Sequence, residues 1–346
     1  MKERQPTVSI LLLAYQQARL VRAAVEACLA QEGGPYEIIL SDDASTDGTF
    51  EAMQSAVRGY DGHHHVVVRR NATNLGIGRH YNELVKLARG ELLVTAAADD
   101  ISVPDRVRQL ELAWVATDCR ADLVASHVFD LDDAGRSHGV IAVDDLAHWR
   151  SIPEWIRRRP YVIGAGHAFT KRVMQRFGPF APDVAFEDQI LSFRAIAMGG
   201  AITVPRPLVH YRRGGTSRCP EFETAQDMFA WKQRQSTREL AVMRQLLADA
   251  RTVGHEMELR ESIGAQLSRA AYMQALGQCA TATARLRTAM DHPELSAWWR
   301  YRRALQATFP DATFAMKSRA AEWRTLLRTA LQPRSGGTRQ HQASSR

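Results

Sequence analysis

The stretch of sequence that decides the fold is Leu92-Leu93-Val94-Thr95-Ala96-Ala97-Ala98-Asp99-Asp100. It begins as an apolar run, which predicts a buried strand over residues 92–96, and it ends in two carboxylates. The carboxyl ends of such strands are where α/β sheets present ligands or metal ions. Two further acidic pairs are Asp42-Asp43 and Glu187-Asp188. Any one pair fits an ordinary loop or helix start, but the order and spacing of all three indicate a shared site.

The first 130 residues, which include this stretch, alternate between strand and helix patterns. Apolar runs predict strands over 8–15, 37–41, 66–68, 92–96 and 122–129. Helical spacing of apolar residues predicts helices over 20–29, 45–58, 81–88 and 104–114. This order predicts an α/β fold with a doubly wound, mostly parallel sheet.

The rest of the chain has a different pattern. Residues 144–218 continue the mixed pattern, residues 221–331 are almost wholly helical, and residues 333–346 are rich in Ser, Gly, Gln and Arg. We therefore expect a catalytic α/β domain over 1–218, a helical C-terminal extension over 219–331 and a disordered basic tail over 332–346.

Composition narrows the class of protein. The four cysteines are far apart and form no CxxC pair, which argues against a zinc ribbon or disulfide scaffold and fits a reducing compartment. The apolar run 7–15 is too short and too β-branched for a signal or membrane segment. Residues 281–346 carry 12 Lys and Arg against 4 Asp and Glu, whereas the first 280 residues have a net charge of −1. A nucleic-acid-binding protein would be basic throughout, so we expect no nucleic-acid partner.

Three strings of residues carry a family resemblance. They are Val8–Tyr15, which ends a strand with a small residue and a tyrosine; Glu37–Thr49, which ends a strand with an acidic turn; and Asn74-Leu75-Gly76, leading to Asp99–Arg106. Together with Glu187-Asp188, they resemble the family 2 glycosyltransferases over residues 7–217. The resemblance implies a GT-A fold and an inverting, metal-dependent, hexosyltransferase-type enzyme. Such an enzyme transfers sugar from a nucleotide-sugar donor to a glycan or lipid-linked acceptor.

By the same resemblance, Asp99 and Asp100 form the metal site. Asp99 would face the ribose and also contribute to the metal, and Asp100 would be the principal ligand. The ion would be Mg²⁺ or Mn²⁺, which prefers carboxylate oxygens and needs few protein ligands when phosphates supply the rest. Many family members carry an additional Asp where this chain has Ala97. We do not interpret this departure as a loss of activity.

The resemblance also assigns nucleotide-sugar-binding residues. Asp42 would contact the base, with Ala14 and Tyr15 forming the adjacent wall, and Arg79 would meet the diphosphate. Each has an ordinary alternative: Asp42 can form an Asx turn ahead of a Ser45 helix cap, Tyr15 can be packing, and Arg79 can be a solvated cation at a helix start.

Asp188 is the expected catalytic base. An inverting transfer is a single displacement in which the acceptor hydroxyl loses its proton during attack, and a positioned carboxylate can take that proton. The alternative is an acidic residue that merely favours the dipole of its helix. His210 and the tract His63-His64-His65 are not expected to bind metal, because their spacing on a strand or loop points the side chains apart.

Two interpretations remain for residues 281–331, where tryptophans alternate with arginines. The helices can lie on an anionic membrane surface near a lipid-linked acceptor, or their tryptophans can pack on the protein body or a second subunit. The expected location is the cytoplasm, and the membrane interpretation would place the protein peripherally on the inner face of the plasma membrane. The resemblance points to bacterial surface-polysaccharide assembly; the sequence does not define an oligomeric state.

Two other functions compete with glycosyl transfer. One is a non-catalytic scaffold that binds nucleotide sugars, which Ala97 and Gly214 would favour. The other is a sugar-nucleotide pyrophosphorylase, which needs a glycine-rich phosphate loop after the first strand. The segment Tyr15–Arg19 contains no glycine, which argues against it.

Overall fold

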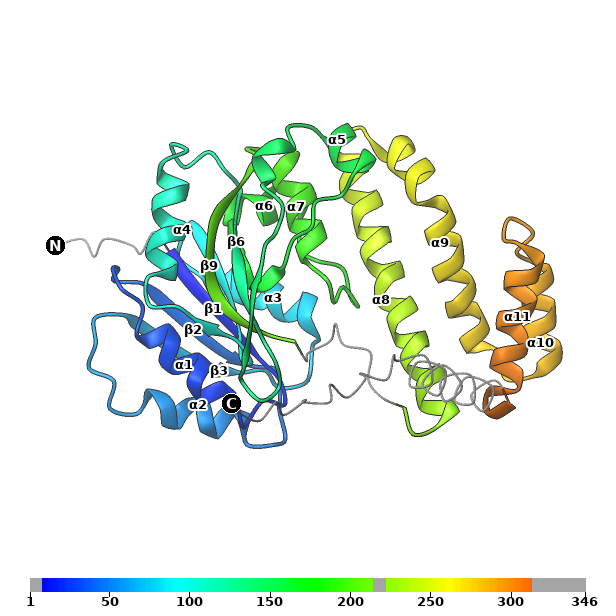
Figure 1. Cartoon of the computed structure of the whole chain (residues 1–346), viewed down its shortest axis with the longest axis horizontal. Coiled ribbons are helices and arrows are strands. Elements are labelled where there is room, and N and C mark those ends of the chain that lie inside the picture. The colour runs from blue at the N-terminus through cyan, green and yellow to red at the C-terminus, as the bar shows by residue number, and fades with distance from the viewer. Residues whose placement is uncertain (1–7, 214–221, 313–346) are drawn as a thin grey trace, which may run out of the picture. The chain divides into compact units, whose positions relative to one another are not determined.

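The computed structural model describes residues 8–213 and 222–312 (Figure 1). The described residues form two compact units, one of 8–213 with 234–271 and the other of 222–233 with 272–312. The expected tail 332–346 and the last part of the helical extension, 313–331, lie outside the described residues. Within the described ranges, none of the helices is long and apolar enough to cross a membrane.

A nine-stranded sheet runs through the first unit in the order β3-β2-β1-β4-β8-β6-β9-β5, with β7 paired to β6. The bounds of the strands are β1 Val8–Ala14, β2 Glu37–Asp42, β3 His65–Arg70, β4 Leu92–Ala97, β5 Ile101–Ser102, β6 Leu123–Leu131, β7 Ser137–Ile141, β8 Ala168–Thr170 and β9 Ala201–Arg212. The first four of the predicted strands are confirmed as parallel neighbours. Strand β8 is antiparallel to both β4 and β6, and β6 and β9 pair in parallel. The α/β prediction is therefore confirmed, with an antiparallel strand inserted in the middle.

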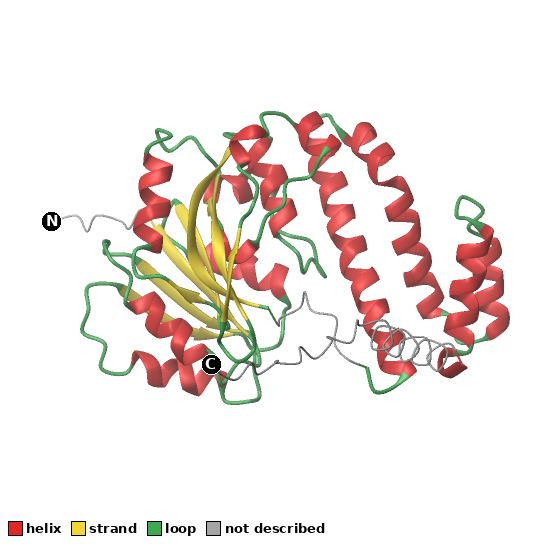
Figure 2. Cartoon of the chain, viewed as in Figure 1, coloured by secondary structure: helices red, strands yellow, loops and turns green. Residues whose placement is uncertain are grey.

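Helices of the first unit cover both faces of this sheet (Figure 2). The helices of the described residues are α1 Val21–Leu29, α2 Thr49–Val57, α3 Ile77–Leu87, α4 Arg106–Val115, α5 Ile152–Arg157, α6 Lys171–Phe177, α7 Asp188–Ile196, α8 Ala225–Thr252, α9 Glu256–Gln278, α10 Ala282–Met290 and α11 Ala297–Thr308, with short 3-10 turns η1 Leu146–His148 and η2 Gly164–Gly166. The helical C-terminal region is thus confirmed as far as residue 312.

Strand β1 explains why both faces are covered. Leu11 belongs to one hydrophobic cluster with α3 and α7, whereas Ile10 and Leu12 belong to another with α1 and α4. Successive side chains of a strand point to opposite faces, so a continuous apolar run needs a helical layer on each side. This arrangement leaves the strand ends free for polar residues.

Strand β1 also approaches the turn before β4 closely. A Cβ atom added at Gly90 would lie 2.6 Å from the backbone nitrogen of Ser9 and 2.7 Å from the carbonyl carbon of Val8. A Cβ added at Gly264, in α9, would meet nothing within 4 Å. A side chain at position 90 would therefore clash with the backbone of β1, whereas a methyl group at position 264 has room.

We predict that Gly90→Ala lowers the free energy of unfolding by about 1–3 kcal/mol, because the backbone of β1 must shift to admit the methyl group. Gly264→Ala is the matched control and raises it by about 0.5–1 kcal/mol through helix propensity. Urea unfolding followed by circular dichroism measures both. Equal stability of the two variants would contradict the close approach.

Candidate active site

The Asp99–Asp100 pair lies directly past β4, as its sequence predicts. Asp100 is buried, and its Oδ1 accepts a hydrogen bond of 2.8 Å from the backbone N–H of Arg212 at the end of β9. The Arg212 guanidinium donates to the carbonyl oxygens of Asp132 (2.9 Å) and Asp133 (3.1 Å). Asp99 is partly exposed, and the guanidinium of Arg212 lowers the pKa of its carboxyl group against the effect of burial.

The electrostatics of this pair favour a bound cation. Burial, with the neighbouring charge of Asp99, raises the pKa of Asp100 to about 8, and burial also raises the pKa of Asp99. A divalent ion would offset both effects, and carboxylate oxygens suit Mg²⁺ or Mn²⁺. The described residues contain no group of three or more His, Cys, Asp or Glu arranged to hold a metal.

A buried arginine fixes the surroundings of the pair. Arg106, at the start of α4, donates to the carbonyl oxygen of Thr95 in β4 (2.8 Å), the carbonyl oxygen of Ala165 in η2 (2.6 Å) and the hydroxyl of Ser102 in β5 (2.9 Å). Its side chain is 1% exposed. The Arg106 guanidinium therefore connects β4, which precedes Asp99, with β5, which follows Asp100, and with the η2 turn.

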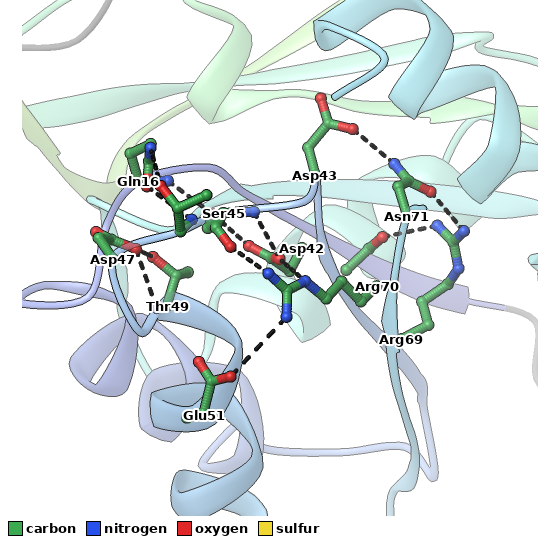
Figure 3. A network of polar contacts seen from close by, with 12 residues as sticks. Gln16, Asp42, Asp43, Ser45, Asp47, Thr49, Glu51, Arg69, Arg70 and Asn71 are labelled. Atoms are coloured by element: carbon green, nitrogen blue, oxygen red, sulfur yellow. Dashed lines mark hydrogen bonds and ion pairs between the residues drawn. The ribbon is translucent and has the colours of Figure 1, made fainter. Parts of the chain in front are cut away.

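The acidic turn after β2 is a dense polar network (Figure 3). The Asp42 carboxylate accepts hydrogen bonds from the backbone N–H of Ser45 (3.0 Å) and from its hydroxyl, and it pairs with Arg70 at 3.2 Å. The Asp42 carboxylate thus bonds the N–H three residues on, whereas the expected Asx turn would bond the N–H two residues on, so that interpretation of Asp42 is wrong. The expected Ser45 cap is wrong, because α2 begins at Thr49 after Gly48, whose φ of +92° suits glycine.

Asp43 organises the segment that follows β3. Its carboxylate accepts hydrogen bonds from the Asn71 side chain (2.7 Å) and from the backbone N–H groups of Leu75 and Gly76 (both 2.9 Å). Gly76 immediately precedes α3, whose first turn carries Arg79. Arg79 is exposed and has no partner among the described residues, so its charge is available to a ligand.

Ala14, Tyr15 and Asp42 come together because β1 and β2 are parallel neighbours. Ala14 and Asp42 are paired in register, and both are buried. Tyr15 follows directly and is 46% exposed, so it is not a packing residue of the core. Tyr15 therefore presents an accessible ring next to Ala14 and Asp42.

The Glu187–Asp188 pair begins helix α7. Asp188 is partly exposed, and its Oδ1 accepts a hydrogen bond of 2.7 Å from the N–H of Gln189. The Tyr81 hydroxyl, on α3, donates to Glu187 Oε1 at 3.4 Å. Burial raises the pKa of Asp188, and burial together with the charge of Asp188 raises the pKa of Glu187 to about 7. A carboxylate with a raised pKa is a better proton acceptor once it is deprotonated.

The η2 turn connects the two acidic pairs. A Cβ added at Gly164 would lie 2.8 Å from Glu187 Oε1 and 3.6 Å from the Cβ of Asp188, so the turn lies directly against this pair. The Thr95 hydroxyl in β4 donates to the carbonyl oxygen of Gly164 at 2.8 Å. The strand that leads to Asp99–Asp100 is therefore bonded to the turn that touches Glu187–Asp188. The sequence did not indicate this contact, nor that of Tyr81.

The histidines have structural partners. His210 stacks on Phe129 with ring centroids 4.7 Å apart. In the His63-His64-His65 tract, His63 and His64 contact the carbonyl oxygens of Gly33 (2.6 Å) and Gln31 (2.9 Å). The rings of His63 and His64 lie 4.2 Å apart between centroids, so these two side chains do not point apart as their spacing predicted.

We predict that Arg106→Met lowers the free energy of unfolding by more than about 3 kcal/mol, because it removes three charge-assisted hydrogen bonds and leaves two buried carbonyl oxygens without this donor. Arg108→Met, on the same helix, is the control. Arg108 is 45% exposed and pairs with Glu32 at the surface, so its loss should cost at most about 1 kcal/mol. Urea unfolding decides, and a similar cost for both variants would contradict the role of Arg106.

Comparison with known proteins supports these observations. A family model described as glycosyl transferase family 2 matches residues 9–173. ExoO of Rhizobium meliloti (strain 1021), a succinoglycan biosynthesis protein, is 27% identical over 242 residues, which cover 66% of this chain and 67% of ExoO. EpsE of Bacillus subtilis (strain 168) is 27% identical over 130 residues, which cover 38% of this chain and 46% of EpsE. This chain therefore matches less than half the length of EpsE.

A solved structure is also similar. It is that of S. aureus TarS, residues 1–349, in complex with UDP-GlcNAc. The TM-score is 0.50 at 13% identity, over 90% of this chain and 92% of that chain. At this identity the likeness concerns the fold, and it confirms the expected GT-A architecture.

Proposed function

Because the chain belongs to the family 2 glycosyltransferases, we propose that it transfers a sugar from a nucleotide-sugar donor to an acceptor hydroxyl by an inverting, metal-dependent reaction. The observation that carries the proposal is the bonding of the η2 turn to β4 while the same turn touches Glu187–Asp188. This arrangement brings a carboxylate pair suited to a metal and a carboxylate suited to proton transfer to one end of the sheet. The GT-A fold and the match of residues 9–173 support it.

In this proposal, the residues around β1 and β2 bind the donor nucleotide. Tyr15 lies beside the base. Asp42 is buried and bonded to Ser45 and Arg70, so it supports the wall next to Tyr15 from within. Arg79 meets the diphosphate. Asp99 and Asp100 would hold the divalent ion, which supplies charge stabilisation for the departing diphosphate.

Asp188 is the residue that takes the proton. It lies partly exposed in the first turn of α7, where an acceptor hydroxyl can reach it. Removing that proton during attack raises the nucleophilicity of the acceptor oxygen. The oxygen forms its bond to the anomeric carbon on the face opposite the bond to the departing nucleoside diphosphate, so this single displacement inverts that carbon. The neighbouring Glu187 has a pKa raised to about 7, so its carboxyl group can carry a proton next to Asp188.

We predict that one nucleotide among UDP, GDP, dTDP and CDP stabilises the protein in Mn²⁺ but not in EDTA. At a hundredfold excess over Kd, binding adds about 2–3 kcal/mol to the stability. Thermal-shift measurements detect it. Asp100→Ala should abolish the effect, whereas Glu26→Ala, on the exposed surface of α1, should keep it. Stabilisation that survives in EDTA or in Asp100→Ala would contradict the metal role.

A second prediction concerns Asp188. Asp188→Asn should lower nucleotide release from the matching donor sugar at least about 100-fold, because the amide cannot accept the proton. The Mn²⁺-dependent thermal shift should remain. Asp183→Asn, an exposed residue in the same loop, is the control and should be fully active. A non-catalytic scaffold would show no nucleotide release in any of these proteins, so the wild-type rate separates that alternative.

The acceptor is proposed to be a glycan or a lipid-linked sugar in surface-polysaccharide assembly. The kinship with ExoO, a succinoglycan biosynthesis protein, supports this choice. The second unit suggests a peripheral membrane contact: Trp298 on α11 is 69% exposed, and the Arg302 guanidinium lies 4.9 Å from its ring centre. An exposed Trp beside Arg is typical of helices that lie at anionic interfaces.

We predict that the full chain cosediments with vesicles of phosphatidylglycerol and that Trp298→Glu reduces the bound fraction several-fold, because it replaces an interfacial ring with a charge that anionic lipid repels. Leu112→Glu is the control, since Leu112 is 56% exposed on α4. Equal binding of the two variants would show that α11 does not contact the membrane and would favour packing against protein instead.

A further inference from the structure

We propose that Arg194 and Asp249 are positioning residues for Asp188, and that helix α8 therefore belongs to the catalytic machinery. The two residues form a buried ion pair between α7, which begins with Asp188, and α8. The proposal rests on the role of Asp188 in the function proposed above. It identifies residues that the family match over 9–173 does not include.

The ion pair is bidentate and enclosed. Arg194 Nε lies 2.7 Å from Asp249 Oδ2, and a second guanidinium nitrogen lies 3.1 Å from Oδ1. The side chains are 0% and 2% exposed. Gln245, one turn earlier on α8, donates to Asp249 Oδ1 at 2.8 Å. Two charges withdrawn from water add little net stability, so an apolar pair would serve packing equally well. The planar, two-point geometry is suited instead to fixing one helix against another.

The same guanidinium holds the start of the loop that leads to Asp188. Its remaining terminal nitrogen donates to the carbonyl oxygen of Gly178, which ends α6, at 3.0 Å. The rings of Phe177 and Phe180 lie 5.4 and 5.1 Å from the guanidinium carbon. Arg194 thus connects α8 with both ends of the path from α6 to α7.

The loop 178–187 is held on two sides. From α8, the Gln245 side-chain oxygen accepts a hydrogen bond of 2.8 Å from the N–H of Ala181. From α3, Asn82 makes two hydrogen bonds of 2.9 Å with the backbone of Phe180, and Gly78 N–H donates to Val184 at 3.0 Å. The last of these contacts lies only three residues before Glu187. The position of Asp188 is therefore set by α3 on one side and by α8 on the other.

Removal of the Asp249 charge should loosen this loop without touching the donor site. Arg194 would keep its bond to Gly178 but lose its charged partner on α8, so α7 could shift or tilt. A displacement of about 1 Å of a reacting group costs about 100-fold in rate. The Asp99–Asp100 pair is held by Arg106 and Arg212, neither of which contacts α8 in the described hydrogen bonds.

The test uses the full chain with Asp249→Asn, which keeps the size of the side chain. Glu37→Gln is the matched control: Glu37 is also a buried carboxylate paired with an arginine, Arg89 at 2.9 Å, but it begins β2 at the end of the sheet away from Asp42. Three quantities are measured: amide hydrogen exchange of residues 178–190, nucleotide release, and the Mn²⁺-dependent thermal shift with the nucleotide that stabilises the wild type most.

Positioning predicts that Asp249→Asn speeds amide exchange in 178–190 and lowers nucleotide release about 10- to 100-fold, with an unchanged nucleotide-induced shift. Glu37→Gln should change neither release nor exchange in that segment. If Asp249→Asn is inactive because it does not fold, Gln245→Ala replaces it, since it removes the bonds to Ala181 and Asp249 alone and should give the same pattern.

Two results overturn the inference. One is a folded Asp249→Asn protein in which amide exchange of 178–190 and nucleotide release are the same as in the wild type. The other is an equal loss of nucleotide release in Glu37→Gln, which would reflect general destabilisation. If the wild-type protein itself releases no nucleotide, the proposed function fails. The exchange comparison then still decides whether α8 fixes the Asp188 segment, since it needs no turnover.

Discussion

The site depends on the buried guanidinium of Arg106. Its hydrogen bonds to Thr95, Ser102 and Ala165 join β4, β5 and the η2 turn through one side chain. Burial lowers the pKa of Arg106 to about 10, so the group remains charged at neutral pH. Because β4 leads directly to Asp99–Asp100 and η2 lies against Glu187, this one cation fixes the segments that carry or contact both acidic pairs.

Both acidic pairs consist of like charges in poorly hydrated surroundings. Burial raises the pKa of Asp99, Asp100, Glu187 and Asp188, and in each pair one charge raises the pKa of its neighbour further. Such pairs are stabilised when a ligand brings positive charge or donates a proton. A donor that arrives with a divalent ion would satisfy the first pair, and a hydroxyl that gives up its proton would satisfy the second.

Much of the fold could be predicted from sequence because continuous apolar runs mark strands that are buried on both faces. The runs ending at Ala14, Asp42 and Ala97 also placed polar residues correctly at one edge, since parallel strands share their carboxyl ends. Segments with weaker local signals were harder. Strand β9 has two prolines, at 205 and 207, which interrupt its apolar pattern, and its pairing with β6 is irregular around them.

Long-range polar pairing could not be predicted at all. Arg194 and Asp249 are 55 residues apart, and nothing in the local pattern of either helix marks them as partners. The contact between Gly164 and Glu187 likewise depends on how η2 folds back against α7. The helices after residue 234 consequently looked like an extension in sequence, whereas the structure includes residues 234–271 in the same compact unit as the sheet.

The most direct test of the account is a crystal structure of the full chain with Mn²⁺ and the nucleoside diphosphate that stabilises it most. The account predicts an ion bound to the Asp99 and Asp100 carboxylates and to the diphosphate, with the base beside Tyr15 and Asp42 and with Asp188 facing the space beyond the terminal phosphate. A nucleotide bound elsewhere, or an ion that does not contact either carboxylate, would contradict the central claim that these acidic segments form one sugar-transfer site.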